Sequence, residues 1–150
     1  MRIYVPLTPQ EIEHDEISPR LVHAVTPDLS RVFPREGEEE LEYVAFLAAA
    51  DDSLRALTTV PRRVVAVADV PTPMVELPAV DEEILESGVH MAEPLSWDRV
   101  ESIHIDEAEA EAVIRDAIAG DERAFEESAE IDLLWYDILE RAALIAALTS

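Results

Sequence analysis

The stretch Arg63-Val64-Val65-Ala66-Val67-Ala68-Asp69-Val70 is apolar at nearly every position. A strand with one wet face alternates apolar and polar side chains, whereas a strand covered on both faces is apolar throughout. We therefore expect residues 63–70 to form a covered strand near the centre of a β-sheet.

Four shorter segments around this strand also carry strand patterns. Residues 2–7 alternate apolar and polar side chains with a period of two, as a half-buried strand requires. Residues 100–105 alternate in the same way. Apolar runs at residues 21–25 and 89–92 complete the predicted strands, whereas residues 71–88 contain three prolines and are predicted to be irregular.

Three segments are predicted to be helices. Residues 36–58 carry apolar side chains at spacings of three and four, which gives a helix one apolar face. Asp106 has the position of a helix cap and Gly120 that of a helix end, which together delimit a second helix. Helical spacing continues from Asp121 to near the C-terminus, so we expect a third helix that pairs with the second as an antiparallel hairpin across Gly120.

These elements predict one α+β domain over residues 1–150. We expect a single small mixed β-sheet of four to five strands, with about three helices packed mainly on one face. A chain of 150 residues is long enough to bury one core without disulfides.

The charge balance is strongly acidic. Lysine and cysteine are absent, and 34 acidic against 11 basic residues give a formal net charge of −23. Such a surface repels nucleic acid and anionic membranes and favours a basic protein partner, with self-association as the alternative. A genome rich in G and C or adaptation to high salt would also give this composition. The absence of cysteine and of any apolar stretch near the ~20 residues of a membrane span predicts a cytoplasmic protein.

Several classes of catalytic and cofactor site are excluded by the residues present. The three glycines lie far apart, at Gly37, Gly88 and Gly120, so the chain has no phosphate-binding loop or dinucleotide fingerprint. The absence of lysine excludes a Schiff base. No serine-elbow or zinc-helix motif occurs either. We assign no catalytic residue, metal ligand or cofactor.

His104 and Asp106 form the one candidate polar site. They lie two residues apart on a predicted strand, so their side chains are expected on the same face, where they could orient an imidazole or begin a metal site. The alternative, which we prefer, is a surface histidine beside a helix cap. We likewise expect His23 to be a hydrogen-bonded, partly buried histidine and not a ligand.

The candidate interaction surface consists of Trp135 and Tyr136 on the predicted third helix, together with Trp97 and Leu148. Aromatic side chains often anchor protein interfaces. Leu148 ends an apolar tail that offers a packing or dimer surface. The preferred alternative for Trp135 is that it is the main aromatic side chain of the core.

Motifs spread over most of the chain resemble an actinobacterial family of small uncharacterised proteins. The resemblance is carried by the start Met1-Arg2-Ile3-Tyr4-Val5-Pro6-Leu7-Thr8, by Ala24-Val25-Thr26-Pro27, Glu39-Glu40-Leu41-Glu42-Tyr43, Ser53-Leu54-Arg55, Arg62-Arg63-Val64-Val65 and Ala68-Asp69-Val70-Pro71, and by Leu134-Trp135-Tyr136. It implies one cytoplasmic domain from an organism of high G+C content, and it brings no activity, ligand or site residue. The chain departs from the family pattern in a short first connection and in the tail after Glu140.

The sequence is compatible with three functions. The first is a non-catalytic acidic binding protein. The second is a small metal- or carboxylate-dependent enzyme that uses His104 and Asp106. The third is an acidic mimic of nucleic acid, which would need carboxylates in rows.

Overall fold

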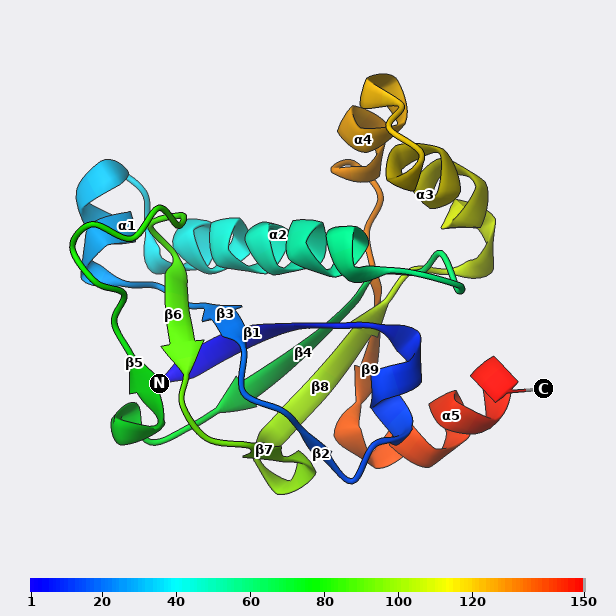
Figure 1. The fold of residues 1–150 in the computed structure, drawn as a ribbon, viewed down its shortest axis with the longest axis horizontal. Helices are drawn as coiled ribbons and strands as arrows, with labels where there is room; N and C mark the ends of the chain where they lie inside the picture. Colours follow the sequence, from blue (N-terminus) through cyan, green and yellow to red (C-terminus); the bar gives the residue numbers. More distant parts are fainter. Residues whose placement is uncertain (150) are drawn as a thin grey trace.

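Strand β4 (Val64–Asp69) lies in the middle of the sheet in the computed structural model, which describes residues 1–149 (Figure 1). All five residues from Val64 to Ala68 are at most 2% exposed, as the apolar run predicts. Its neighbours are β1 (Arg2–Leu7) and β8 (Val100–Ile105), both antiparallel to it. The predicted central strand is therefore confirmed.

The sheet extends outward from these three strands. On one side follow β3 (Leu21–His23), β6 (Gly88–Met91) and the short edge strand β5 (Val75–Glu76), and on the other side lies the edge strand β9 (Leu134–Asp137). Every pairing in it is antiparallel. A second, small sheet joins β2 (Glu16–Ile17) to β7 (Leu95–Ser96).

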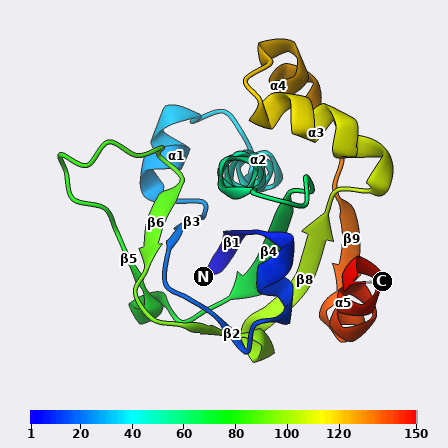
Figure 2. The same cartoon turned by 45° about the vertical axis from the view of Figure 1, so that its right-hand side comes forward.

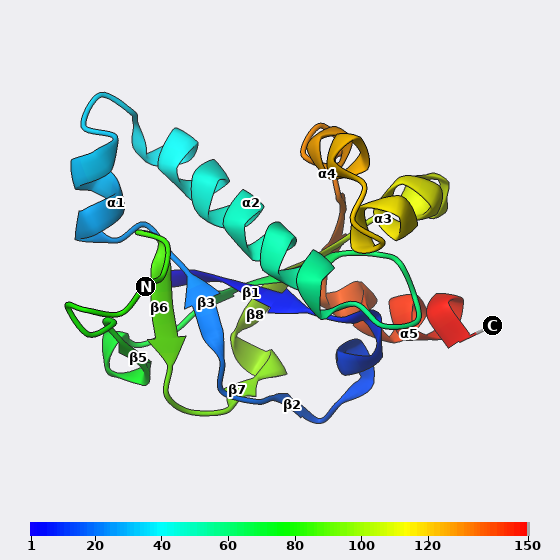
Figure 3. The same ribbon diagram turned by 45° about the horizontal axis from the view of Figure 1, so that its top comes forward.

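Helix α2 (Glu38–Ala56) crosses one face of the main sheet (Figures 1 and 3). Its small residues Ala45, Ala49 and Ala50 pack on Tyr4, Val65 and Val67. Because alanine side chains are short, the helix backbone approaches the strands closely. The shorter helix α1 (Pro27–Val32) precedes it, with Thr26 as its N-cap.

The opposite face carries the larger core. It is formed by aliphatic side chains of β1, β3, β4, β6 and β8 together with Ile12, Ile17, Leu95 and Trp97. Helix α5 (Arg141–Thr149) closes this face through Leu144, Ile145 and Leu148. Five 3₁₀ turns connect the elements within the described residues: Pro9–Glu13, Thr72–Met74, Trp97–Arg99, Ala108–Ala110 and Ile138–Glu140.

Helices α3 (Glu111–Ile118) and α4 (Glu122–Ser128) form a hairpin beside the C-terminal end of α2. Gly120 stands at the turn with a φ of +102°, a conformation that a residue with a Cβ adopts only with strain. The predicted hairpin across Gly120 is therefore present, but its second helix ends at Ser128 instead of continuing to the C-terminus.

A buried ion pair joins this hairpin to the sheet. Arg63 donates from its backbone N–H and from Nε to Oδ2 of Asp106, and from Nη2 to Oδ1, each at 2.8 Å. The same guanidinium donates to the carbonyl of Ser128 at 2.9 Å and to that of Ile131 at 3.3 Å. Arg63 is 1% and Asp106 0% exposed, and each charge is compensated by hydrogen bonds in the way that buried ions require.

Four features of the predicted fold class are wrong, although the chain is still α+β. The described part of the chain has a seven-stranded sheet and a two-stranded sheet, not one sheet of four to five strands. Every strand pair in this part is antiparallel, so the sheet is not mixed. The same part has five α-helices, and they cover both faces of the main sheet instead of mainly one. No helix in this part is long and apolar enough to cross a membrane.

The secondary structure predicted from the sequence differs most from the observed one in the C-terminal third of the chain. Residues 134–137 form strand β9 and not the middle of a helix. Asp106 does not cap a helix either, because both of its carboxylate oxygens accept from Arg63.

Replacing Arg63 by methionine is expected to lower the free energy of unfolding by about 3–5 kcal/mol, because Asp106 is left as an unpaired buried charge. The neighbouring Arg62 pairs with Glu111 in a partly exposed position, so Arg62→Met serves as the matched control and should cost about 1 kcal/mol or less. Urea unfolding of both variants measures the difference. Equal losses in the two variants would contradict the role given to Arg63.

Candidate functional site

His104 and Asp106 do not converge on one site. His104 belongs to β8 and lies on the face that α2 covers, with its ring 5.1 Å from the ring of Phe46 in an edge-to-face contact. Asp106 follows the end of β8, and its carboxylate points into the interior toward Arg63. The acid–base or metal pair that the spacing allowed is therefore not formed.

The imidazole of His104 is half-buried and neutral at physiological pH. Its Nε2 lies 3.0 Å from Oγ of Ser102. Burial, together with the positive charge of Arg2, lowers the pKa of His104 from 6.5 to about 4. At pH 7 the ring is consequently an uncharged aromatic group and not a cation.

A groove of about 440 Å³ opens above His104 between α2 and β9. Its walls and floor are formed by Tyr43, Phe46, Leu47, His104, Ile131, Asp132, Leu133 and Trp135. Trp135 is 60% and Tyr43 52% exposed. Exposed apolar and aromatic side chains that are grouped in a groove often mark a binding site, so this groove is the best candidate for one.

A second hollow of about 480 Å³ continues the groove toward the start of α2. Tyr43 belongs to both hollows, and the second is lined by Phe33, Val44 and the carboxylates of Glu36, Glu39 and Glu40. Glu39 and Glu40 lie four and three residues before Tyr43 on α2, so they share its side of the helix, whereas Glu36 precedes the helix. The two hollows thus form one aromatic and acidic surface, which we call the α2–β9 groove.

Arg2, whose charge contributes to the low pKa of His104, is paired with carboxylates of its neighbours. Its Nη1 lies 2.8 Å from Oε2 of Glu101 and 3.9 Å from Oδ2 of Asp69. On the same side of the sheet, Tyr4 donates its hydroxyl to Glu42 of α2 at 3.3 Å. The charge of Arg2 is therefore already paired with carboxylates outside the groove lining.

The four residues predicted as an interaction surface do not form one surface, because Trp97, Tyr136 and Leu148 all pack in or against the larger core. Trp135 is 60% exposed, so the preferred prediction that it is the main aromatic side chain of the core is wrong. Trp135 lines the α2–β9 groove, whereas the next residue, Tyr136, turns to the opposite face of β9 and packs on the larger core. Trp97 is 8% exposed, and the guanidinium of Arg141 lies 4.2 Å above its ring.

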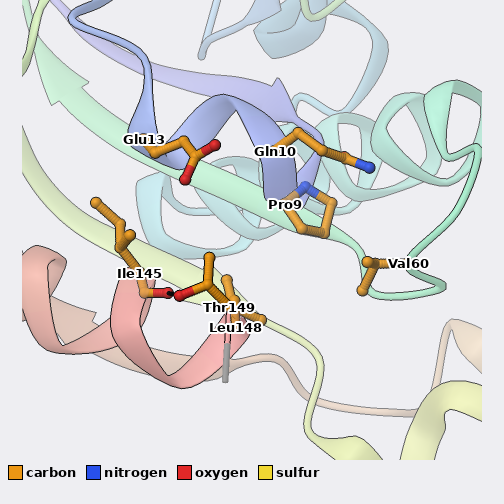
Figure 4. Close-up of a pocket in the computed structure, with 7 residues that line it drawn as sticks. All are labelled: Pro9, Gln10, Glu13, Val60, Ile145, Leu148 and Thr149. Atoms are coloured by element: carbon orange, nitrogen blue, oxygen red, sulfur yellow. Dashed lines mark hydrogen bonds between the residues drawn. The ribbon is translucent and has the colours of Figure 1, made fainter.

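Leu148 borders a small hollow of about 90 Å³ with Pro9, Gln10, Val60 and Ile145 (Figure 4). This hollow lies between α5 and the first 3₁₀ turn. It is too small for more than a few water molecules. Of the predicted surface residues, only Trp135 meets the exposed aromatic groove.

The sequence does not reveal a hydrogen-bonded row of three polar side chains, Ser87, His23 and Asp52, of which the first two are buried and Asp52 is partly exposed. Nδ1 of His23 lies 2.7 Å from Oγ of Ser87, and its Nε2 lies 2.7 Å from Oδ2 of Asp52. The partners lie 64 and 29 positions away in the sequence, so no local motif indicates them. His23 is hydrogen-bonded and buried, as expected.

Ser87, His23 and Asp52 have the residue types of a nucleophile–base–acid triad. The burial of Ser87 and His23, however, indicates a structural role. Ser87 is 2% and His23 1% exposed, and a serine nucleophile must be reached by its substrate. Among the described residues, no group of three side chains is placed to hold a metal ion. The chain Ser87–His23–Asp52 therefore ties β3 to α2 and to the start of β6.

An NMR pH titration of the histidine ring protons is expected to give His104 an apparent pKa of about 4. Because the unfolded chain protonates this residue near pH 6.5, the folded state binds fewer protons between pH 6.5 and 4, and acidification through this range should lower stability. The difference in pH dependence between the native chain and His104→Gln isolates this contribution. If His104 instead titrates near pH 6.5, its ring is exposed to water, and the buried position given to it at the bottom of the groove is wrong.

No curated protein and no solved structure matches the chain. A family model described as "Family of unknown function (DUF6912)" matches residues 1–145. That match spans nearly the whole chain, including every element that builds the α2–β9 groove. The chain is therefore a member of this family.

Proposed function

We propose that the protein is a non-catalytic binding protein whose α2–β9 groove takes a basic segment of a partner protein. The observation that carries the proposal is the exposure of Trp135 and Tyr43, at 60% and 52%, beside the carboxylates of α2 and Asp132. Arginine and lysine side chains stack on aromatic rings through cation–π contacts and pair with carboxylates. The two kinds of side chain together fit a cationic ligand better than either kind alone.

The net charge supports the same partner. A formal charge of −23 attracts basic proteins over a distance set by the ionic strength and accelerates their association. The same charge repels a second copy of the chain, so we favour a basic partner over self-association. The cysteine-free composition suits a reducing compartment, and the cytoplasm is the compartment that we propose.

The two alternative functions gain less support from the geometry. An enzyme built on His104 and Asp106 would need these side chains to face one another, and they do not. A nucleic-acid mimic needs carboxylates in rows, whereas the acids of the groove are interleaved with aromatic rings. A basic protein segment is the ligand class that uses both.

Binding is expected to change the fluorescence of Trp135. The variant Trp97→Phe leaves Trp135 as the single tryptophan, and the probe is a short synthetic peptide that alternates arginine and valine. We expect saturable binding that weakens by about tenfold between low and high salt, because charges contribute to it. A peptide with glutamate in place of arginine should not bind.

Two variants test whether the groove is the site. Trp135→Ala, followed by calorimetry, should bind the arginine peptide at least about tenfold more weakly. Leu139→Ala is the matched control, since Leu139 is 91% exposed and lies outside the residues that line the groove. The proposal is wrong if Trp135→Ala binds the arginine peptide as tightly as the native protein does, or if the native protein does not bind the peptide.

A further inference from the structure

Strand β9 is one of the two edges of the main sheet. It pairs with β8 on its inner side, with Ile103 opposite Tyr136 and His104 opposite Trp135, and no strand within residues 1–149 pairs with its outer side. Figure 2 shows β9 as the outermost strand, with α5 below it and α3 above it. An open edge presents backbone N–H and C=O groups to any segment that can pair with them.

The hydrogen bonds around Asp137 show which backbone groups point outward. The N–H of Asp137 is taken by Oε2 of Glu140 at 2.9 Å, so it does not pair with β8. Residues of an antiparallel strand alternate between inward and outward pairing. Tyr136 and Leu134 therefore pair with β8, and the N–H and C=O of Trp135 point away from the sheet.

The open part of the edge is short. On its C-terminal side, the reciprocal cap between Asp137 and Glu140 occupies the next outward N–H. On its N-terminal side, the carbonyl of Ile131 accepts from Arg63. The acidic side chains of Asp132 and Asp137 flank the remaining stretch, and such charges discourage edge-to-edge pairing between identical chains.

We infer that the partner segment binds as an added β-strand on the outer edge of β9, pairing with the peptide groups of Trp135. This inference rests on the proposed function of the α2–β9 groove and specifies the conformation of its ligand. Side chains of an extended segment alternate between the two faces of the sheet. Every second side chain therefore faces the groove side, where Trp135 and the carboxylates favour arginine or lysine.

Charge complementarity identifies the occupant as a basic segment and not a second copy. Pairing two β9 strands would bring Asp132 and Asp137 of both copies close together. It would also join two chains that each carry a formal net charge of −23, which repel one another. A basic strand meets the same carboxylates with the opposite sign. Strand addition is a common recognition mode in which main-chain hydrogen bonds give affinity and alternate side chains give specificity.

Backbone N-methylation of the arginine–valine peptide separates main-chain pairing from side-chain contacts. One peptide carries N-methyl groups on its arginine residues and the other carries them on its valine residues, so the side chains of the two are identical. In an added strand, only one of these two sets of N–H groups faces β9. We expect one methylated peptide to keep the affinity of the parent peptide and the other to lose at least about tenfold.

The outcomes distinguish the two proposals. If both methylated peptides bind as well as the parent peptide, strand addition is wrong while the basic-segment groove stands. If the parent peptide does not bind at all, both are wrong. Sedimentation that shows a dimer of the chain, broken by Trp135→Ala, would assign the edge to a second copy and overturn the inference.

Discussion

The buried pair of Arg63 and Asp106 is the interaction on which the C-terminal half of the fold depends. Arg63 precedes the central strand β4, and Asp106 follows its neighbour β8. The guanidinium that neutralises Asp106 also holds the carbonyls of Ser128 and Ile131, where the chain leaves the α3–α4 hairpin. Because a buried carboxylate without this partner would be costly, the hairpin exit is held at one position beside the sheet.

That position sets the geometry of the groove. From Ile131 the chain runs directly into β9, which places Trp135 opposite His104 and across from the aromatic side chains of α2. Burial of the His104 ring lowers its pKa and keeps it uncharged. The positive charge that the groove lacks is thus left for a ligand to supply, and the acids along α2 favour such a ligand.

The sequence predicts the core of the sheet and α2 well because their signals are local. The apolar run of β4 and the three-and-four spacing of α2 each decide one element without reference to the rest of the chain. Strands β2, β5 and β7 have two residues each, which is too short for any periodicity to appear. Their presence explains much of the difference between the predicted and the observed sheet.

The error at residues 131–139 has a different cause. The apolar residues Ile131, Leu134, Trp135 and Ile138 fit both a helical spacing and a short strand, and no glycine or proline separates this run from α4. What decides in favour of a strand is the vacant edge of β8, which is a tertiary feature. The cap between Asp137 and Glu140 is the one local signal of a new start, and it lies at three-residue spacing in the sequence.

The same distinction applies to the candidate site. The prediction that we preferred for Trp135, the main aromatic side chain of the core, is wrong, because residues 134–137 form an edge strand that leaves this side chain 60% exposed. The sequence singles out His104, but not its position beside Tyr43 and Trp135, because the three residues come from elements far apart in the sequence. The prediction that Asp106 caps a helix is wrong because its partner Arg63 lies 43 positions away in the sequence, where no local pattern reveals it.

The most direct test of this account is a nuclear Overhauser measurement between the Hα atoms of His104 and Trp135, in the native chain and in Arg63→Lys. Lysine keeps the charge beside Asp106 but lacks the fork that also reaches Ser128 and Ile131. We expect a strong cross-strand signal in the native chain and a weakened one in the variant, while the signals between β1 and β4 persist in both. Helical signals through residues 131–139 in the native chain, or an unchanged 104–135 signal in the variant, would contradict it.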